Sequence, residues 1–368
     1  MNIFVEKSQF SDELKLFQGI FEKKTLMDIL QNIKLTAHEN GILELVATDL
    51  EIGLSSTMSV NIKEPGTFTV GGRDLYDLIS KMPEGNVEIS EKNDLQVLIT
   101  NEAKTSKYKL LGLQSSDYPK LPESDFSTAI DITMKKLNSM INKNYYIVSP
   151  EMKFNLGGAL LSISGEKLEM AATDGHRLSY SSYEGDFGVS EPLEFIISRK
   201  TLLELLKIGD TGDIQFSYDK NNIFFKYMNK ILSSRIIDQK FPNYKAVIPE
   251  KTEFTATLNT GQLLQTLRRV LIFKTRNNGV VFNFSPNKLV LERVTPDKGE
   301  AHDELEINYQ GKPISVAFNG NFIIDFLTHI ESEEFEIHMN DKESSFIYKP
   351  SQTTQDIHFE YVVMPLNI

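Results

Sequence analysis

Apolar residues recur along the chain with the two periods that distinguish strands from helices. Residues 213–217 and 223–227 alternate apolar and polar positions, which is typical of strands with one buried face. Residues 73–81 instead carry apolar side chains at helical spacing and stop before Pro83 and Gly85, a common helix terminator. Another helix is expected to begin at Ser11, whose side chain can cap its first turn.

The same order of elements is predicted three times. In the first third, strands are expected at residues 2–6, 42–47, 53–60, 87–90, 96–100 and 106–113, with helices from residue 11 and over 73–81. The second third has predicted helices at 135–142 and 200–208 and strands at 159–163, 167–172, 213–217 and 223–227. The last third has predicted helices at 261–273 and 321–330 and strands at 335–339 and 346–349. Strands interrupted by isolated helices indicate an α+β fold, with two helices per unit packed on antiparallel sheet.

Short segments also recur with a period near one third of the chain. Residues 41–49 return as 166–174 and, more weakly, as 287–295. Three prolines are equally spaced: Pro119, Pro242 and Pro365. So long a period indicates repeated domains rather than stacked hairpins. We therefore expect three domains, at 1–125, 126–250 and 251–368.

Composition narrows the possible classes of protein. The chain has 368 residues, a formal net charge of −12 and no cysteine. The charge argues against a protein that coats nucleic acid by bulk charge, although a local basic surface stays possible. Disulfides and thiolate metal sites are excluded. The sequence has neither an apolar run of membrane length nor the layout of a signal peptide, so a cytoplasmic protein is expected.

Basic side chains lie on most of the predicted helices, opposite the apolar stripe. They are Arg73, Lys81, Lys135, Lys136, Lys143, Arg199, Lys200, Lys207, Arg268 and Arg269, and Lys23 and Lys24 follow the first helix. Each could simply belong to a solvated helix face. If equivalent helices point the same way, the charges instead combine into one surface that holds nucleic acid through its phosphates, without sequence preference.

Residues 172–178 (ATDGHRL) break the repetition, since only the first third of the chain has a partial counterpart, at residues 47–51. Asp174 and His176 could serve a hydrolase or transferase, which needs a nucleophile, a base and an orienting acid within mutual reach. The chain has no G-x-S-x-G nucleophile elbow and no G-x-x-x-x-G-K-[ST] phosphate loop, and its histidines are scattered. No metal or cofactor site is expected. The favoured interpretation is a tight turn at Asp174 and Gly175, after which Leu178 returns to an apolar surface.

The C-terminal residues 361–368 (YVVMPLNI) are apolar almost to the end. Chain ends fray unless they dock, so this segment is expected to form a last strand. Val362, Met364 and Leu366 could in addition leave part of a peptide-binding groove exposed.

These segments together resemble the bacterial DNA polymerase III beta subunit family, the sliding clamps. The most specific pieces are residues 172–178, 241–249 (FPNYKAVIP), 48–51 (TDLE) and 361–365 (YVVMP), and the resemblance covers the whole chain. It implies three similar domains per chain and two chains joined head to tail in a six-domain ring. Helices would line the central hole of the ring, and duplex DNA would pass through it. The closed ring would then stay on the DNA without tight contacts to the phosphates.

The resemblance also implies a non-catalytic processivity factor of DNA replication. Its partners would be double-stranded DNA, the replicative polymerase, the clamp loader, translesion polymerases and mismatch-repair proteins, the proteins binding through short linear motifs. A specialised second clamp, such as one that shields its host from an antibiotic, stays open as an alternative.

By the same resemblance, a partner-peptide groove lies between the second and third domains. Its residues would be Leu156, Thr173, Gly175, His176, Arg177, Leu178, Pro242, Val247, Val362, Val363, Met364, Pro365 and Leu366. Burying two large apolar side chains of a partner there could contribute about 3–6 kcal/mol before ordering costs. The chain departs from the family pattern at Ala246 and Asn367, where basic residues are common. The family's paired aromatic residues before the groove correspond to Phe154 and Asn155, so one of the two is missing.

Two further surfaces follow from the resemblance. The DNA-facing positions would be Lys24, Arg73, Lys81 and Lys200. The dimer interface would place Tyr108 and Leu110 of one chain against Leu271 and Ile272 of the other.

Overall fold

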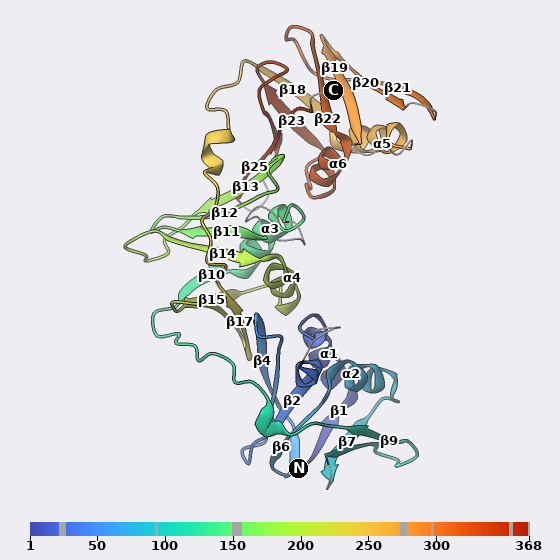
Figure 1. Ribbon diagram of the computed structural model, residues 1–368, viewed down its shortest axis with the longest axis vertical. Helices are drawn as coiled ribbons and strands as arrows, with labels where there is room; N and C mark the ends of the chain where they lie inside the picture. Colours follow the sequence, from blue (N-terminus) through green and yellow to red (C-terminus); the bar gives the residue numbers. More distant parts are fainter. Residues whose placement is uncertain are drawn as a thin grey trace. The chain divides into compact units, whose positions relative to one another are not determined.

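The computed structural model describes residues 1–21, 27–92, 95–148, 157–272, 278–295, 298–352 and 356–366 (Figure 1). The chain forms two compact units. One consists of Met1–Lys135 with Lys200–Ile236, and the other of Lys136–Arg199 with Ile237–Ile368. The chain passes from one unit to the other within two helices, α3 (Met134–Asn144) and α4 (Arg199–Ile208), and a third time between Ile236 and Ile237.

The first unit combines two antiparallel sheets with helices α1 (Lys7–Leu16) and α2 (Gly72–Lys81), which pack side by side (Figure 1). Its strands are β1 (Asn2–Glu6), β2 (Asn32–Ala37), β3 (Ile42–Thr48), β4 (Ile52–Ser59), β5 (Asn61–Glu64), β6 (Gly66–Gly71), β7 (Asn86–Lys92), β8 (Gln96–Asn101), β9 (Lys107–Leu111), β10 (Ile130–Thr133), β15 (Asp213–Tyr218), β16 (Asn222–Tyr227) and β17 (Lys230–Arg235). A five-stranded sheet has the order β5-β1-β7-β8-β9, and an eight-stranded sheet has the order β10-β15-β16-β17-β4-β3-β2-β6.

The second unit has the same construction, with helices α5 (Thr260–Val270) and α6 (Gly320–Thr328) in contact. Its strands are β11 (Gly158–Ile163), β12 (Lys167–Thr173), β13 (Arg177–Glu184), β14 (Leu193–Ser198), β18 (Phe254–Asn259), β19 (Gly279–Ser285), β20 (Lys288–Thr295), β21 (Gly299–Glu306), β22 (Ile314–Asn319), β23 (Glu334–Met339), β24 (Phe346–Pro350) and β25 (His358–Val363). An eight-stranded sheet has the order β14-β11-β12-β13-β25-β24-β23-β18, and a four-stranded sheet has the order β21-β20-β19-β22.

The order of elements repeats three times along the chain. Strands β1, β10 and β18 each lead directly into a helix, and so do β6, β14 and β22. Strand register repeats as well: the cross-strand rows Ile3–Ile89–Ile99, Ile130–Phe216–Phe225 and Ala256–Ile337–Tyr348 occupy the same place in the three copies. The predicted α+β fold of three repeats is therefore confirmed.

Each eight-stranded sheet joins strands of two successive repeats. In the first unit, β4 pairs with β17 and places Leu54 opposite Leu232. In the second, β13 pairs with β25 and places Ser179 opposite Tyr361. The strands of the middle repeat are thus shared: β10 and β15–β17 belong to one unit and β11–β14 to the other. This sharing explains why three repeats form only two compact units.

Several predicted boundaries differ from the structure. The first helix begins at Lys7, and its N-cap is Glu6, whose carboxylate accepts a hydrogen bond from Gln9 N at 2.8 Å. Ser11 lies inside this helix, so its predicted capping role is wrong. Strand β1 pairs through Glu6 with β7 and leads straight into the helix, which puts the cap at the strand end.

The helices of the third repeat are shorter than predicted. Helix α5 ends at Val270 and α6 at Thr328, where the C-cap His329 donates its backbone N–H to Phe326 O. Residue 273 lies outside the described residues. Among the described helices, none is long and apolar enough to cross a membrane.

Candidate functional site

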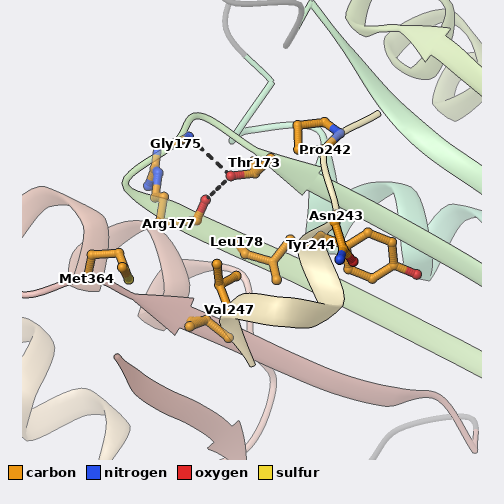
Figure 2. A pocket seen from close by; sticks show the side chains of 10 residues that line it. Thr173, Gly175, Arg177, Leu178, Pro242, Asn243, Tyr244, Val247 and Met364 are labelled. Carbon is orange, nitrogen blue, oxygen red and sulfur yellow. Dashed lines mark hydrogen bonds between the residues drawn. The ribbon is translucent and has the colours of Figure 1, made fainter. Parts of the chain in front are cut away.

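The second unit contains an apolar pocket of about 160 Å³. It is lined by Thr173, Gly175, Arg177, Leu178, Pro242, Asn243, Tyr244, Val247, Val362 and Met364 (Figure 2). These residues come from the β12–β13 turn, from the segment after Pro242 and from the end of β25. The pocket therefore forms where the second repeat, its linker and the C-terminal strand meet.

Side-chain hydrogen bonds fix the turn between β12 and β13. The Thr173 hydroxyl donates to Arg177 O at 2.7 Å and accepts from Gly175 N at 3.1 Å (Figure 2). Asp174 Oδ1 accepts from the backbone N–H groups of His176 and Arg177 at 3.0 and 3.1 Å. Gly175 has φ +86°, which glycine adopts without strain. The predicted tight turn is confirmed.

The first repeat builds the same turn after β3. The Thr48 hydroxyl donates to Ile52 O at 2.9 Å, and Asp49 Oδ1 accepts from Glu51 N at 2.9 Å and Ile52 N at 2.7 Å. The position equivalent to Gly175 is Leu50, which has φ +78°. The repeated Thr-Asp pair in the sequence thus encodes one repeated turn.

Leu178 and Val362 form the apolar floor of the pocket. They lie opposite each other on β13 and β25 and are almost completely buried. Both belong to a core cluster with Leu160, Ile196 and Ile347. Because β13 and β25 come from different repeats, the floor exists only where these two strands pair.

One wall is the 3-10 helix η4 (Tyr244–Val247). Tyr244 is buried and stacks on Tyr180 with ring centroids 5.8 Å apart, and burial raises the pKa of its hydroxyl. Val247 and Met364 are 42% and 41% exposed at the pocket mouth. Exposed apolar side chains around a buried apolar floor suit an apolar ligand.

Arg177 supplies the charge at this site. Its side chain is only 8% exposed, and its guanidinium donates to Asp174 Oδ2 at 2.9 Å, to Asp325 Oδ2 at 2.6 Å and to the Tyr361 hydroxyl at 3.0 Å. It also lies over the Phe322 ring at 4.2 Å. Burial acts to lower the pKa of Arg177, but Tyr361, Asp325 and Asp174 outweigh it and raise the pKa. The guanidinium thus stays charged and links the turn to α6.

The pocket brings together most of the residues expected for the groove. Those in its lining are Thr173, Gly175, Arg177, Leu178, Pro242, Val247, Val362 and Met364. Val363 is fully buried and, by strand alternation, points to the other face of β25 from Val362. His176 is exposed, and Pro365 and Leu366 follow the strand, with Leu366 N donating to Ala317 O at 2.8 Å. Leu156, Phe154, Asn155 and Asn367 lie outside the described residues.

Sequence reasoning missed two lining residues, Asn243 and Tyr244. Both lie within residues 241–249, one of the segments that carried the resemblance, and Pro242 precedes the 3-10 helix that begins at Tyr244. Ala246 is exposed on η4. Its neighbour Lys245 is 65% exposed and lies 3.7 Å from Glu169, so a cation is present near the position where the family commonly has one.

Asp174 and His176 are not arranged as a catalytic pair. The Asp174 carboxylate accepts bonds from the turn backbone and from Arg177, while the His176 side chain is exposed. No group of three or more histidine and acidic side chains within the described ranges is placed to hold a metal ion.

Two of the expected DNA-facing cations have protein partners. Arg73 Nη2 donates to Phe21 O at 2.6 Å. Lys200 Nζ forms an ion pair with Asp49, the buried acid of the first Thr-Asp turn, and contacts Ile20 O at 3.3 Å. Lys81 is exposed, and Lys24 lies outside the described residues.

The expected interface residues differ in exposure. Tyr108 is 44% and Ile272 69% exposed, and Leu110 is half-buried. Leu271 lies over Gly320, where an added Cβ would be 2.9 Å from Leu271 Cδ1. Leu271 thus contributes to packing within the second unit.

Three repeats with shared sheets, and one apolar pocket where the second repeat meets the C-terminal strand, define a clamp-type protein. The sequence matches the DNA polymerase III beta subunit in three consecutive parts: the N-terminal domain at residues 1–122, the central domain at 131–243 and the C-terminal domain at 245–367. The chain therefore belongs to the family of DNA polymerase III beta subunits.

Individual relatives agree along their whole length. The beta sliding clamp of Vibrio cholerae is 27% identical over 377 residues, and that of Caulobacter vibrioides is 28% identical over 380 residues, with both chains fully covered in each case. The crystal structure of the DNA polymerase III subunit beta from Pseudomonas aeruginosa has 26% identity, full coverage of both chains and a TM-score of 0.92. A Pseudomonas aeruginosa clamp bound to griselimycin matches with the same values. The relatives are named as clamps, in agreement with the expectation of a non-catalytic protein.

Proposed function

We propose that the chain is a ring-forming processivity factor that encircles duplex DNA and tethers replication and repair proteins through the pocket. The main support for this proposal is the apolar pocket. Its floor of Leu178 and Val362 is buried, while Val247 and Met364 stay exposed at its mouth. Partners would be the replicative polymerase, the clamp loader, translesion polymerases and mismatch-repair proteins in the cytoplasm. The three domains would span residues 1–125, 126–250 and 251–368.

The occupant of the pocket is proposed to be a short peptide with two large apolar side chains. An apolar floor of this size accommodates such side chains, and methionine at the mouth adapts to several shapes. The buried Arg177, held by Asp325, places a fixed positive charge beside the floor. Together they favour one site that several proteins share in turn.

Ring closure is proposed to join two chains head to tail. Strands β9 and β21 end their sheets within the described part of the chain, and such edges are normally covered. Exposed apolar residues accompany both edges: Tyr108 and Leu111 on β9, and Ile272 and Val294 beside β21. Lys24, Arg73, Lys81 and Lys200 remain proposed DNA-facing positions, although Arg73 and Lys200 must then also serve the protein contacts described above.

Peptide binding tests the pocket. Met364→Asp is expected to abolish binding of a peptide ending in Leu-Phe, measured by fluorescence anisotropy, because a carboxylate at the mouth opposes burial of the apolar side chains. Met228→Asp is the matched control, since Met228 is 73% exposed on the β16–β17 hairpin of the other unit. Equal loss in both variants, or none in Met364→Asp, would refute the groove. Removal of the residues after Val363 is expected to have the same effect and to leave the dimer intact.

Sedimentation and retention on closed circular DNA test the ring. Ile272→Asp is expected to give monomers, because its exposed side chain would become a buried charge in the interface. Leu271→Asp is less informative, since Leu271 also packs over Gly320. A wild-type chain that stays monomeric at micromolar concentration and leaves circular DNA as fast as linear DNA would contradict the proposed function.

A further inference from the structure

We infer that two copies of the chain pair β9 of one with β21 of the other in a single register, which places Lys109 opposite Glu300 and Lys107 opposite His302. This inference rests on the head-to-tail dimer of the proposed function. It adds the register and the charges that select it, and both come from the repeats within one chain.

The first two repeat junctions supply the template. At the first, a row of cross-strand neighbours runs through four strands: Ala47, Leu54, Leu232 and Phe225. At the second, the equivalent row is Ala172, Ser179, Tyr361 and Tyr348. All eight side chains are buried. The two junctions therefore use the same strands in the same register.

A third row is present in two halves. One half is Arg293 beside Ala301 on β20 and β21, and the other is Tyr108 beside Ile99 on β9 and β8. Arg293 is equivalent to Ala47 and Ala172 because segments 41–47, 166–172 and 287–293 align. Ile99 is equivalent to Phe225 and Tyr348 by the sheet rows given above.

Joining the halves completes the row and places Ala301 opposite Tyr108. The residues equivalent to Tyr108 are Leu232 and Tyr361. Both are fully buried, whereas Tyr108 is 44% exposed in the single chain. A strand from a second copy would bury Tyr108 as its equivalents are buried. The antiparallel direction of the first two junctions then puts Lys109 opposite Glu300 and Lys107 opposite His302.

Charge complementarity supports this pairing. On β9, Lys107 and Lys109 are exposed, and on β21 the exposed residues of one face are Glu300, His302, Glu304 and Glu306. The ring nitrogens of His302 lie 3.2 Å from the carboxylates of Glu292 and Glu304, so two carboxylates flank the imidazole that faces Lys107. Opposite charges across a strand pair attract, and diagonal neighbours contribute too.

The same charges oppose the wrong assemblies. Two β9 strands paired with each other would bring lysines together, and two β21 strands would bring carboxylates together. Like charges directly opposite each other destabilise a strand pair, and proteins use this effect to control sheet edges. The two edges thus reject copies of themselves and accept each other, which directs two chains to join head to tail and close a ring.

Disulfide trapping tests the register, because the chain has no cysteine of its own. Lys109→Cys combined with Glu300→Cys in one chain is expected to give a covalent dimer under mild oxidation, read on a non-reducing gel. Lys109→Cys with Glu304→Cys is the control, since Glu304 lies four residues along the strand, about 13 Å away, beyond disulfide reach. Both positions on β21 are exposed, so folding is unaffected.

Charge exchange tests the electrostatic part. Lys109→Glu and Glu300→Lys are each expected to raise the dimer Kd by about fivefold per interface, or about 25-fold for a ring with two equal interfaces. The two changes combined should restore the Kd to within about twofold of the parent, and Lys120→Glu, with the same change in net charge, should leave it unaltered. Reversals without effect would overturn the charge pairing.

The outcomes separate the two proposals. A dimer that crosslinks through the control pair, or through neither pair, overturns the register and leaves the ring of the proposed function standing. A parent chain that sediments as a monomer removes the ring itself. A crosslink only through Lys109 and Glu300 together with rescue by charge exchange establishes both.

Discussion

The Arg177 guanidinium donates to Asp325 at 2.6 Å and so ties the turn that lines the pocket to helix α6. Asp325 itself is not part of the pocket lining. The bond therefore offers a way to change the position of Arg177 without altering any group that a bound peptide would touch.

Asp325→Asn is expected to weaken peptide binding about threefold to tenfold, because an uncharged amide oxygen accepts a weaker hydrogen bond and holds Arg177 less firmly beside the floor. The free energy of unfolding should fall by only about 1 kcal/mol, since Asp325 is 37% exposed and Arg177 keeps Asp174. Fluorescence anisotropy and chemical denaturation measure the two effects. Peptide affinity within twofold of the parent would show that α6 does not position Arg177.

The equivalent turn residues Gly175 and Leu50 give opposite predictions. Both have positive φ, +86° and +78°. An added Cβ at Gly175 meets nothing within 4 Å, so Gly175→Ala should lower stability only through backbone strain, by about 1 kcal/mol. Leu50→Gly should raise stability by about 0.5–1 kcal/mol, because the strain is removed at some cost in unfolded-chain entropy.

Thermal unfolding of the two variants checks this pair. Gly175→Asn serves as the control, because asparagine tolerates the left-handed region better than alanine and should be less destabilising. If Leu50→Gly lowers the melting temperature, the exposed Leu50 side chain contributes more to the native state than its backbone conformation costs.

Glu360 predicts a specific acid sensitivity. Burial acts to raise its pKa, but hydrogen bonds from His358 and Lys349 outweigh burial and lower the pKa from 4.5 to about 2. A lowered carboxyl pKa stabilises the fold fully above the unfolded value and loses that effect as the pH falls from about 4.5 towards 2. Glu360→Gln should therefore be less stable than the parent at pH 7, by about 1–3 kcal/mol.

Urea denaturation at pH 7, 4 and 2.5 measures this dependence. The difference between Glu360→Gln and the parent should shrink as the pH falls. The exposed Glu306→Gln variant is the control and should follow the parent at every pH. A difference that stays constant with pH would mean that the Gln variant disturbs packing and not charge.

Local sequence patterns predicted the repeated helices, part of the strands and the turn beside the pocket, since a helix stripe or a Thr-Asp turn is encoded by neighbouring residues. The pocket residues followed from the family resemblance. Helix α2, for example, was predicted to within one residue of its observed start. The strands that were missed are β2, β5, β6, β10, β13, β14 and β17 to β22. For two of them burial gives the reason: every residue of β13 except the last is buried, and β14 is buried over 195–197, so neither shows clear alternation.

Long-range pairing was beyond the sequence patterns. Nothing local shows that Leu178 and Val362 form one floor, because they meet only when β13 pairs with β25. The prediction that Lys200 faces DNA likewise relied on its helix position alone. Its ion pair with Asp49 joins residues far apart in sequence and could not be anticipated.

That ion pair yields the last prediction, on the competing roles of Lys200. The Asp49 side chain is 4% exposed and Lys200 is 33% exposed, so removing the cation leaves a buried carboxylate without its counter-charge. Lys200→Gln should lower the free energy of unfolding by about 1–3 kcal/mol. Lys81→Gln, at an exposed position, should leave stability unchanged.

Both variants are also measured for DNA affinity as a function of salt, where loss of a phosphate contact reduces the slope by about one. A Lys200→Gln variant of unchanged stability and with a reduced salt slope would show that Lys200 mainly contacts DNA and contributes little through its ion pair with Asp49. A destabilised variant with an unchanged slope would assign Lys200 to the Asp49 turn and leave Lys81 as the better candidate for DNA.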